Sequence, residues 1–451
     1  MTNERSSFTG RIGFVLAAAG SAVGLGNIWR FPYLAAKYGG GIFLLIYIIL
    51  AISFGFALMI TEIAIGRKTG LSAIEAYKAL DKRFAFVGVL SALVPVIIFP
   101  YYCVIGGWVV KYFISYLTGQ GAAAAGSEYF SNFIAQPVSP VLWLSVFIIL
   151  TAVVVMCGVE KGVEKASRIM MPVLLVLAVV IVIFVMTMPG AWEGVKYYIT
   201  PSLENFSVTT VLAALGQLFY SMSLAMGIMI TYGSYMKKQD DLEKSVGQIE
   251  IFDTGIALLA GLMIVPAVFV FSGGDREALN AGAGLMFVTL PKVFDAMPLG
   301  HFVGGIFFLL VLFAALTSSI SLMETIVSIL QDKLHWKRIT TCLVVMVCAF
   351  LIGIPSSLGY GVWDSVKILG MSILDFFDFL SNSVLMPIVA LCSCIFVGWV
   401  IKTKAIIDEV KISSKFRREK LYHVVTRYVA PIFLIAILVS SVMNALGWIK
   451  I

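Results

Sequence analysis

The sequence predicts an all-α, polytopic membrane protein, and three observations lead to this fold class. Of its 451 residues, 60% are hydrophobic and only 13% are charged, and the mean hydropathy is +0.99, far from the composition of soluble domains. Apolar stretches of about 20 residues, the length that crosses a bilayer, recur along the chain. The first of these stretches also contains residues that an ordinary membrane helix does not tolerate.

Eleven apolar stretches can be placed in order, and we predict that each forms a membrane-spanning helix. They are residues 12–36, 41–65, 86–116, 141–157, 169–188, 207–235, 246–271, 300–330, 339–353, 366–400 and 428–446. The ninth is short, and the longest ones must contain breaks, tilts or loop portions. Because eleven is an odd number, the two termini are expected on opposite faces of the membrane.

The first stretch is interrupted by the segment GSAVGLGNIWRFP at residues 20–32. It holds three glycines within seven residues, the polar Asn27 and the charged Arg30, and it closes on Pro32. Glycine costs roughly 1 kcal/mol relative to alanine in a helix interior, and proline costs more. Secondary transporters build ion and substrate sites from such broken helices. The alternative, a tightly packed helix whose glycines admit a neighbour, leaves Asn27 and Arg30 unexplained.

The sixth stretch carries a second interruption. In GQLFYSMSLAMGIMITYGSYM, residues 216–236, apolar ends flank Ser221, Ser223, Ala225 and Gly227. Interrupted first and sixth helices are what an inverted repeat of five plus five helices predicts.

The placement of basic residues predicts the orientation. If the N-terminus is cytoplasmic, 24 of the 32 lysines and arginines fall in cytoplasmic segments, whereas the long outside loop at 118–140 has none. This asymmetry follows the positive-inside rule. The net charge of +7 is therefore a topology signal, and nucleic-acid binding is rejected as its cause.

An enzyme is not predicted. The six cysteines all lie within or beside apolar stretches, and the three histidines lie far apart near the ends of stretches or in loops. Neither set has the spacing of a zinc site or of a nucleophilic triad. No organic cofactor is expected.

The broken first helix also carries a resemblance. GSAVGLGNIWRFP is similar to the first-helix signature of the neurotransmitter:sodium symporter family, and further family motifs follow in the right order: Gly66-Arg67, Tyr101-Tyr102, residues 221–235 and LTSSIS at 316–321. The chain most resembles the bacterial branch with eleven helices, which includes transporters of tyrosine and of hydrophobic amino acids.

The resemblance implies the organisation of the chain. Broken helices 1 and 6 would belong to a five-plus-five inverted repeat, and helix 11 would be peripheral. The expected parts are a cytoplasmic segment at 1–10, a first repeat at 11–190, a second repeat at 191–400, a cytoplasmic loop at 401–427, and helix 11 with an extracellular C-terminus at 428–451.

Two sodium sites are also implied. Sodium prefers oxygen ligands, which the freed carbonyls of the first break and the adjacent hydroxyls of LTSSIS can supply; taken alone, such hydroxyls are typical of helix packing. One implied site consists of Gly20, Val23, Ala314, Thr317 and Ser318. The other consists of the substrate carboxylate, Ala22, Asn27, Ser221 and, on helix 7, Asp253.

Asp253 departs from the family pattern, because many relatives have asparagine there. An acid at bilayer depth is costly and usually functional; the alternative is a solvated acid near the cytoplasmic mouth. Animal relatives need chloride beside the first sodium site. Here Tyr47, Gln217 and Ser221 resemble neighbours of that anion, but Ala257 stands where chloride-dependent relatives tend to have serine. We therefore expect chloride-independent transport, with outward proton movement accompanying the return of the empty protein.

The substrate site follows from charge and from resemblance. Half-helix N-termini attract carboxylates and C-terminal carbonyls attract ammonium groups, so a zwitterion can be held without a dedicated ion pair. Relatives that carry monoamines place aspartate at the position of Gly24, where glycine leaves room for a carboxylate that Tyr102 would contact. The implied site is Ala22, Gly24, Gly26, Ile98, Tyr102, Tyr220, Ser221, Ser223, Met226, Ser318 and Leu322.

Gates need charges that pair in one conformation and separate in another. Arg30 resembles the outer-gate arginine and Asp378 its acidic partner, with Asp375 as the second candidate and Gln217 as support; the alternative for Arg30 is snorkelling to the interface. Glu62 resembles the buried acid that braces the broken sixth helix. The implied inner gate consists of Arg5, Phe8, Ser234, Tyr235 and Asp332.

The sequence therefore predicts a sodium-coupled symporter of the plasma (inner) membrane that takes up neutral hydrophobic or aromatic L-amino acids by alternating access. A tyrosine-only transporter and a broader one both fit this pocket. The alternatives on the same fold are a channel, revealed by a current without substrate coupling, and an amino-acid sensor, revealed by binding without flux. The expected partners are the amino acid, sodium ions and the lipid bilayer, and the oligomeric state is left open.

Overall fold

The computed structural model describes residues 7–272, 284–445 and 448. Its described regular elements are helices, which confirms the predicted all-α class. The helices that correspond to the first five predicted spans are α1 (Arg11–Ala22) with α2 (Phe31–Lys37), α3 (Gly41–Leu50) with α4 (Phe56–Thr69), α6 (Ala85–Leu117), α9 (Ser139–Met156) and α10 (Lys165–Met186).

The second half continues in the same order. Its helices are α12 (Val208–Ser221) with α13 (Ile228–Ser234), α14 (Leu242–Phe271), α16 (Gly300–Leu334), α17 (Arg338–Leu358), α18 (Ile373–Asp378) with α19 (Met386–Ile395), and α22 (Ala430–Ala445). The tenth span begins at Ile373, later than the predicted residue 366, because residues 366–372 form a turn. In this turn Gly370 adopts φ +78°, and Ser372 caps the helix by accepting the N–H of Asp375 at 3.1 Å.

Among the described residues, nine helices are long and apolar enough to cross a membrane, or ten if the bent pair Arg11–Ala22 and Gly26–Lys37 is one span. The helix axis bends by 56° between the two parts of that pair. The count falls short of the predicted eleven because the predicted sixth span is not included. This span is divided into two short helices, α12 and α13, which are separated by six residues.

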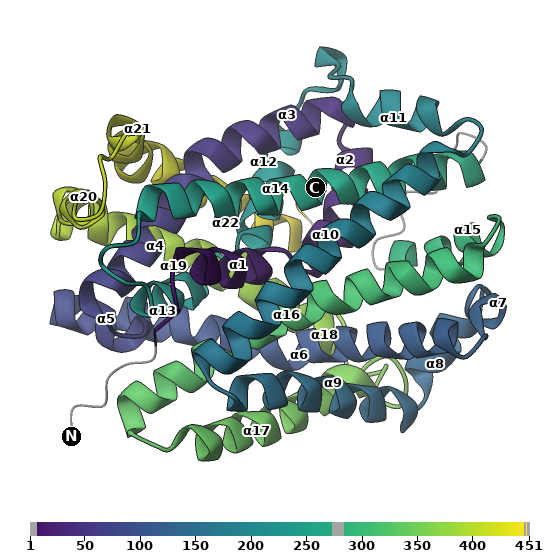
Figure 1. Cartoon of the computed structure of the whole chain (residues 1–451), viewed down its shortest axis with the longest axis horizontal. Helices are drawn as coiled ribbons and strands as arrows, with labels where there is room; N and C mark the ends of the chain where they lie inside the picture. The colour runs from purple at the N-terminus through teal and green to yellow at the C-terminus, as the bar shows by residue number, and fades with distance from the viewer. Residues whose placement is uncertain (1–6, 273–283, 446–447, 449–451) are drawn as a thin grey trace.

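Short helices gather at the two ends of the bundle (Figure 1). One end holds α5 (Ala73–Leu80), α20 (Lys404–Lys411) and α21 (Glu419–Val424), which come from segments predicted to be cytoplasmic. The opposite end holds α7 (Gly121–Ala124), α8 (Tyr129–Ala135), α11 (Ala191–Ile199) and α15 (Leu290–Asp295). At the first end, the buried Arg67 of α4 pairs with Glu409 of α20 at 2.9 Å.

Burial separates central helices from peripheral ones. In the most apolar 18-residue stretch of α16, 78% of the residues are buried, compared with 28% in that of Val159–Met186 and 33% in that of Glu419–Asn444. α22 shows why: Leu434 and Ile437 pack inward, whereas Ile432 and Ile435 remain exposed. An exposed apolar face on a helix of this length is a lipid-facing surface. The core therefore forms around α1, α13 and α16, where both broken helices meet.

Candidate transport site

The first broken helix turns its main chain toward α16. α1 ends at Ala22, and a π-helical turn, Gly26–Arg30, leads into α2. The break brings the chain close to side chains that leave no room for a Cβ atom: at Gly24 it would lie 2.6 Å from Ser318 Oγ and 3.2 Å from the Tyr102 hydroxyl. Glycine here permits an approach that any larger residue would block.

The second break is held in a strained conformation. Between α12 and α13, Ser223 has φ +52° and Ala225 has φ +59°, which is unfavourable for residues with a Cβ atom. The carboxylate of Glu62, buried on α4, accepts the N–H of Ala225 at 2.6 Å. This contact satisfies a main-chain donor that the broken helix leaves without an intrahelical partner.

A cavity of about 30 Å³ lies between the two breaks, enough for one or two water molecules. Its lining residues are Ser21, Ala22, Gly24, Leu25, Gly26, Asn27, Ile98, Tyr102, Tyr220, Ser223, Met226, Ile228, Ser318 and Leu322. Ten of the eleven residues predicted for the substrate site are among them, and the remaining one, Ser221, lies behind Asn27.

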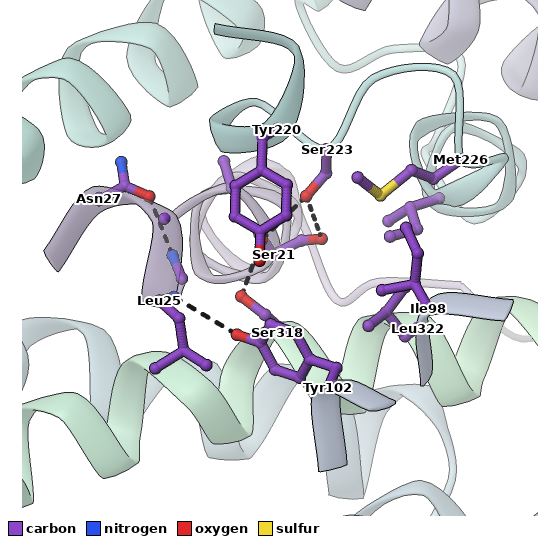
Figure 2. A pocket seen from close by; sticks show the side chains of 14 residues that line it. Ser21, Leu25, Asn27, Ile98, Tyr102, Tyr220, Ser223, Met226, Ser318 and Leu322 are labelled. Atoms are coloured by element: carbon purple, nitrogen blue, oxygen red, sulfur yellow. Dashed lines mark hydrogen bonds between the residues drawn. The ribbon is translucent and has the colours of Figure 1, made fainter. Parts of the chain in front are cut away.

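The cavity has a polar side and an apolar side. Figure 2 shows Ser21, Ser318 and Tyr102 close together, with Ile98, Met226 and Leu322 gathered beside them. The hydroxyl of Tyr102 accepts the N–H of Leu25 at 3.4 Å. Ser21, Leu25 and Ile228 also line the cavity but were not predicted; two of them lie inside the glycine-rich segment, and that position was the available signal.

The five residues of one predicted sodium site come together where α1 meets α16. The hydroxyl of Ser318 lies 3.5 Å from the carbonyl oxygen of Gly20 and 3.4 Å from that of Val23. The hydroxyl of Thr317 donates to the carbonyl of Ala314 at 3.1 Å. These groups are uncharged oxygen donors, which suit a hard monovalent cation.

The other predicted site contains a buried carboxylate surrounded by neutral groups. Asp253 is 0% exposed. It accepts hydrogen bonds from Asn27 at 2.7 Å, from Ser221 at 2.7 Å and from Tyr47 at 3.3 Å. Among the described residues it forms no ion pair, so its charge is not balanced by a protein cation. This burial excludes the alternative of a solvated acid near the cytoplasmic mouth.

The predicted outer-gate charges line one cavity but do not touch. Arg30 and Asp378 both line a space of about 330 Å³ with Trp29 and Trp108. The described part of the chain has no ion pair within 4.0 Å between them. The guanidinium of Arg30 lies 5.2 Å from the ring centroid of Tyr220, and Asp378 accepts from Asn382 at 2.7 Å.

The supporting residues of the outer gate have other contacts. Gln217 donates to the carbonyl of Gly26 at 2.9 Å, and so it ties α12 to the first break. Asp375, the second acidic candidate, also lines the outer cavity and accepts from Ser372 at 2.7 Å.

The opposite end of the site is closed by aromatic packing. Phe8 is 1% exposed, and its ring packs edge-to-face against Phe14, Tyr232 and Tyr235. Its N–H donates to the carbonyl of Tyr235 at 3.1 Å.

Three further members of the predicted inner gate can be placed. Asp332 accepts the N–H of Ser72 at 2.8 Å, and Ser234 donates to the carbonyl of Thr231 at 2.5 Å. The hydroxyl of Tyr235 donates to Glu324 at 2.8 Å. Arg5, predicted to pair with Asp332, lies outside the described residues.

Two charged networks at this end were not predicted. Buried Glu324 of α16 pairs with Arg338 of α17. Buried Glu164, just before α10, pairs with Arg168 at 2.6 Å and accepts the N–H of Thr9 at 2.9 Å. Arg338 lies fourteen residues after Glu324 and in another helix, so sequence spacing could not reveal that pairing. Arg168 lies only four residues after Glu164, and this i, i+4 spacing was the available signal for the second pair.

Two interrupted helices that enclose a small site, inside an apolar helical bundle, define a multi-pass membrane transporter rather than an enzyme. The chain belongs to the Sodium:neurotransmitter symporter family, whose profile matches residues 5–133 and 130–448. Members of this family are sodium-coupled secondary transporters, as the sequence motifs predict.

Several relatives are similar over nearly their whole length. An uncharacterized sodium-dependent transporter of Bacillus subtilis, YhdH, is 36% identical over 441 residues, covering 96% of each chain. One from Haemophilus influenzae is 33% identical over 97% of this chain and 98% of its own. The crystal structure of MhsT in complex with L-phenylalanine matches with a TM-score of 0.88 and 37% identity, over 97% of this chain and 100% of that one.

Proposed function

We propose that this protein couples inward sodium flow to the uptake of neutral hydrophobic or aromatic L-amino acids by alternating access. The observation that carries the proposal is the lining of the central cavity, which combines main-chain groups and hydroxyls with apolar side chains and includes no charged side chain. Such a lining suits a zwitterion with an uncharged side chain. The phenylalanine bound to MhsT, a protein similar over almost the whole chain, supports the same substrate class.

The substrate's carboxylate would lie beside Gly24. The Tyr102 hydroxyl and the N–H of Leu25 lie 3.4 Å apart there, and a carboxylate that replaced their mutual contact would gain two donors. The absence of a side chain at Gly24 keeps this space open. The ammonium group would then lie against main-chain carbonyls at the ends of the half-helices, where the helix dipole favours a cation.

The substrate's side chain would lie among Ile98, Met226 and Leu322. The cavity of about 30 Å³ holds one or two water molecules, which the substrate would displace, and these walls would repack around its side chain. Met226 is unbranched and can repack at low cost. We therefore expect a range of hydrophobic substrates.

Two sodium ions are proposed as co-substrates. One would bind the oxygen atoms of Gly20, Val23, Ala314, Thr317 and Ser318. The other would bind Ala22, Asn27, Ser221 and Asp253, together with the substrate carboxylate. Each charge moving inward gains about 2.3 kcal/mol per 100 mV, so two ions supply about 4.6 kcal/mol, enough for a roughly thousandfold substrate gradient.

Chloride independence follows from Asp253. Two sodium charges and a buried substrate need a nearby negative charge in a medium of low dielectric constant. The carboxylate of Asp253 is fixed in place by Asn27, Ser221 and Tyr47, so it would supply this charge without a mobile anion. After sodium release, the carboxylate would accept a proton for the return step.

The proposed location is the plasma membrane, with a cytoplasmic N-terminus. The basic residues support this orientation, because they concentrate in the segments that carry α5, α20 and α21. In each of the proposed repeats, residues 11–190 and 191–400, the first span is broken: α1 with α2 in one, and α12 with α13, which follow α11, in the other.

Uptake into proteoliposomes tests the proposal directly. Labelled phenylalanine, leucine, tyrosine and tryptophan should accumulate with external sodium chloride or sodium gluconate, and not with choline. Unlabelled lysine, glutamate or tyramine at equal concentration should not compete. Accumulation without sodium, or equal competition by charged amino acids or tyramine, would contradict the proposed substrate class and coupling.

A further inference from the structure

A cavity of about 750 Å³ lies at the end of the bundle where α14 begins and where α20 and α21 are found (Figure 1). One wall is the first part of α14, and the other comes from residues 414–418, in the segment that links α20 to α21. Among the described residues, this space shares no lining residue with the central site. We call it the linker cavity.

The helix that forms one wall is longer than a membrane span requires. The 30 residues of α14 extend over about 45 Å, whereas the hydrocarbon core of a bilayer is about 30 Å thick. Lys244, Gly247, Gln248 and Ile251 follow the spacing of one helix face, and all four line the cavity. Lys244 is exposed, and Ile251 is 73% exposed. This face therefore passes from the headgroup layer into the hydrocarbon layer along the wall of the cavity.

The other wall is held in place by two carboxylates of the α14 start. Asp241 accepts the hydroxyl of Ser414 at 2.9 Å. Glu243 uses both oxygen atoms, because it accepts the N–H of Arg417 at 2.8 Å and that of Arg418 at 3.0 Å. These contacts fix residues 414–418 against α14, so the basic residues of this segment stay beside the cavity.

The cavity carries an excess of positive charge. Lys244, Lys415 and Arg417 line it, are exposed, and form no ion pair within the described part of the chain. Arg418, the fourth basic residue of the lining, pairs with Glu250 at 3.2 Å. Counting Glu250 and the two carboxylates that hold the linker, four cations face three acids. A ligand with a single negative charge would balance this difference.

The apolar surroundings indicate the source of that charge. The guanidinium of Arg418 lies 3.5 Å from the carbonyl oxygen of Ile52, and the side chain of Ile52 is 49% exposed. Ile251 belongs to the cavity wall itself. A phosphodiester on a lipid would place its charge among the lysines and its hydrocarbon chains along these isoleucines, whereas a soluble phosphate ester would leave the apolar part uncovered. Basic clusters at the membrane surface attract anionic lipids.

We propose that the linker cavity binds the phosphodiester headgroup of an anionic phospholipid, such as phosphatidylglycerol, whose chains lie along Ile251. The bound lipid connects the start of α14 to the segment between α20 and α21. Only the choice of leaflet rests on the proposed orientation. Binding is measured without transport, so its outcome is independent of the proposed function.

Native mass spectrometry of the purified full-length chain measures the affinity for the first bound dioleoyl-phosphatidylglycerol. Dioleoyl-phosphatidylcholine, with the same chains and no net charge, is the control lipid, and glycerol 1-phosphate is the headgroup ester without chains. The test variant combines Lys244→Gln with Lys415→Gln, and a second variant replaces both by arginine. The matched control combines Lys333→Gln with Lys337→Gln, which removes the same charge from exposed positions outside the cavity.

We expect the glutamine variant to bind phosphatidylglycerol about tenfold more weakly, while the arginine variant and the matched control retain the affinity of the parent. Phosphatidylcholine should bind weakly to all of them. Equal phosphatidylglycerol affinity of the parent and the glutamine variant would overturn the site, and so would equal affinity of the parent for both lipids.

A further variant separates a lipid from a soluble phosphate ester. Ile251→Ser should weaken the binding of phosphatidylglycerol, because the chains lose an apolar contact on the cavity wall. Displacement of the lipid by an equal concentration of glycerol 1-phosphate, or unchanged lipid binding in Ile251→Ser, would overturn the assignment to a phospholipid.

Discussion

At the scale of single residues, Asp253 is the group whose chemistry matters most. A carboxylate that is 0% exposed and surrounded by an amide and two hydroxyls is stable in this position only if a cation or a proton accompanies it during part of the cycle. Its partners come from three different spans, since Asn27 follows α1, Tyr47 lies on α3 and Ser221 ends α12. Any change of charge at this point is therefore transmitted to both broken helices.

The first prediction is that Asp253→Asn makes uptake respond to chloride. The amide keeps the size of the side chain but removes the charge, so a mobile anion gains a role beside the sodium ion. Uptake should fall in gluconate buffer and partly recover when chloride replaces gluconate. Glu250→Gln is the control, because Glu250 lies on the same helix but pairs with Arg418 at 3.2 Å. Full activity of Asp253→Asn in gluconate, with unchanged pH dependence, would remove the charge-balancing role.

A second prediction concerns the hydroxyl pair on α16. Replacing Thr317 and Ser318 together by alanine removes two oxygen donors from the proposed sodium site while the protein still folds. Sodium-dependent substrate binding should weaken about tenfold, or roughly 1.4 kcal/mol. Ser319→Ala is the matched control, since the hydroxyl of Ser319 lies 2.8 Å from that of Thr151 and not at the break. A scintillation binding assay that gives the same sodium affinity for the double variant and the control would refute the site.

At the scale of elements, the two broken helices illustrate what a sequence can and cannot predict. Both breaks could be predicted because glycines, Asn27 and Ser221 occur within apolar stretches. Such residues are unfavourable in a membrane helix unless they serve a site. The motif resemblance then identified side chains on α6 and α16 that the structure brings to the same cavity. The positive φ angles of Ser223 and Ala225 could not be predicted, because tertiary contacts impose them against local preference.

The third prediction tests how the sixth span stays broken. In Glu62→Ala, the N–H of Ala225 loses its acceptor, which costs about 1–3 kcal/mol in a buried setting. The thermal stability of the detergent-solubilised protein and its affinity for substrate should both fall. Glu62→Gln keeps an oxygen acceptor in the same place, and should retain most of both. If the alanine and glutamine variants behaved alike, the hydrogen bond to Ala225 would not be what holds the break.

At the scale of the whole molecule, the two ends of the site differ. The outer cavity between Arg30 and Asp378 has a volume of about 330 Å³, whereas Phe8 and three aromatic rings fill the opposite side. Alternating access requires that such a difference reverse during the cycle. The sequence predicted residues for each end, but the pair Glu324–Arg338 and the contact of Glu164 with the N–H of Thr9 depend on how separate segments pack, which no motif encodes.

The fourth prediction is that Phe8→Ala shifts the population toward a form open to the cytoplasm. The aromatic cluster loses its central ring, so closure of the inner side becomes less favourable. A cysteine at Ile105, which lines the outer cavity, should then react at least about threefold more slowly with an impermeant thiol reagent. The background carries Cys157→Ser and Cys348→Ser, because both native thiols are exposed. Phe302→Ala on the exposed side of α16 is the control, and labelling rates equal to that control would exclude Phe8 from the inner gate.

The central cavity is lined both by main-chain groups and by apolar side chains, and this combination bears on how such proteins diversify. The groups around Gly20, Val23 and Leu25 belong to the backbone, so a point mutation cannot delete them without disturbing the bend itself. Ile98, Met226 and Leu322 are ordinary side chains, and exchanging one for a larger or smaller neighbour reshapes the pocket in a single step. Point mutations can therefore reshape the apolar wall of the pocket while the main-chain oxygen atoms of the proposed sodium site stay in place.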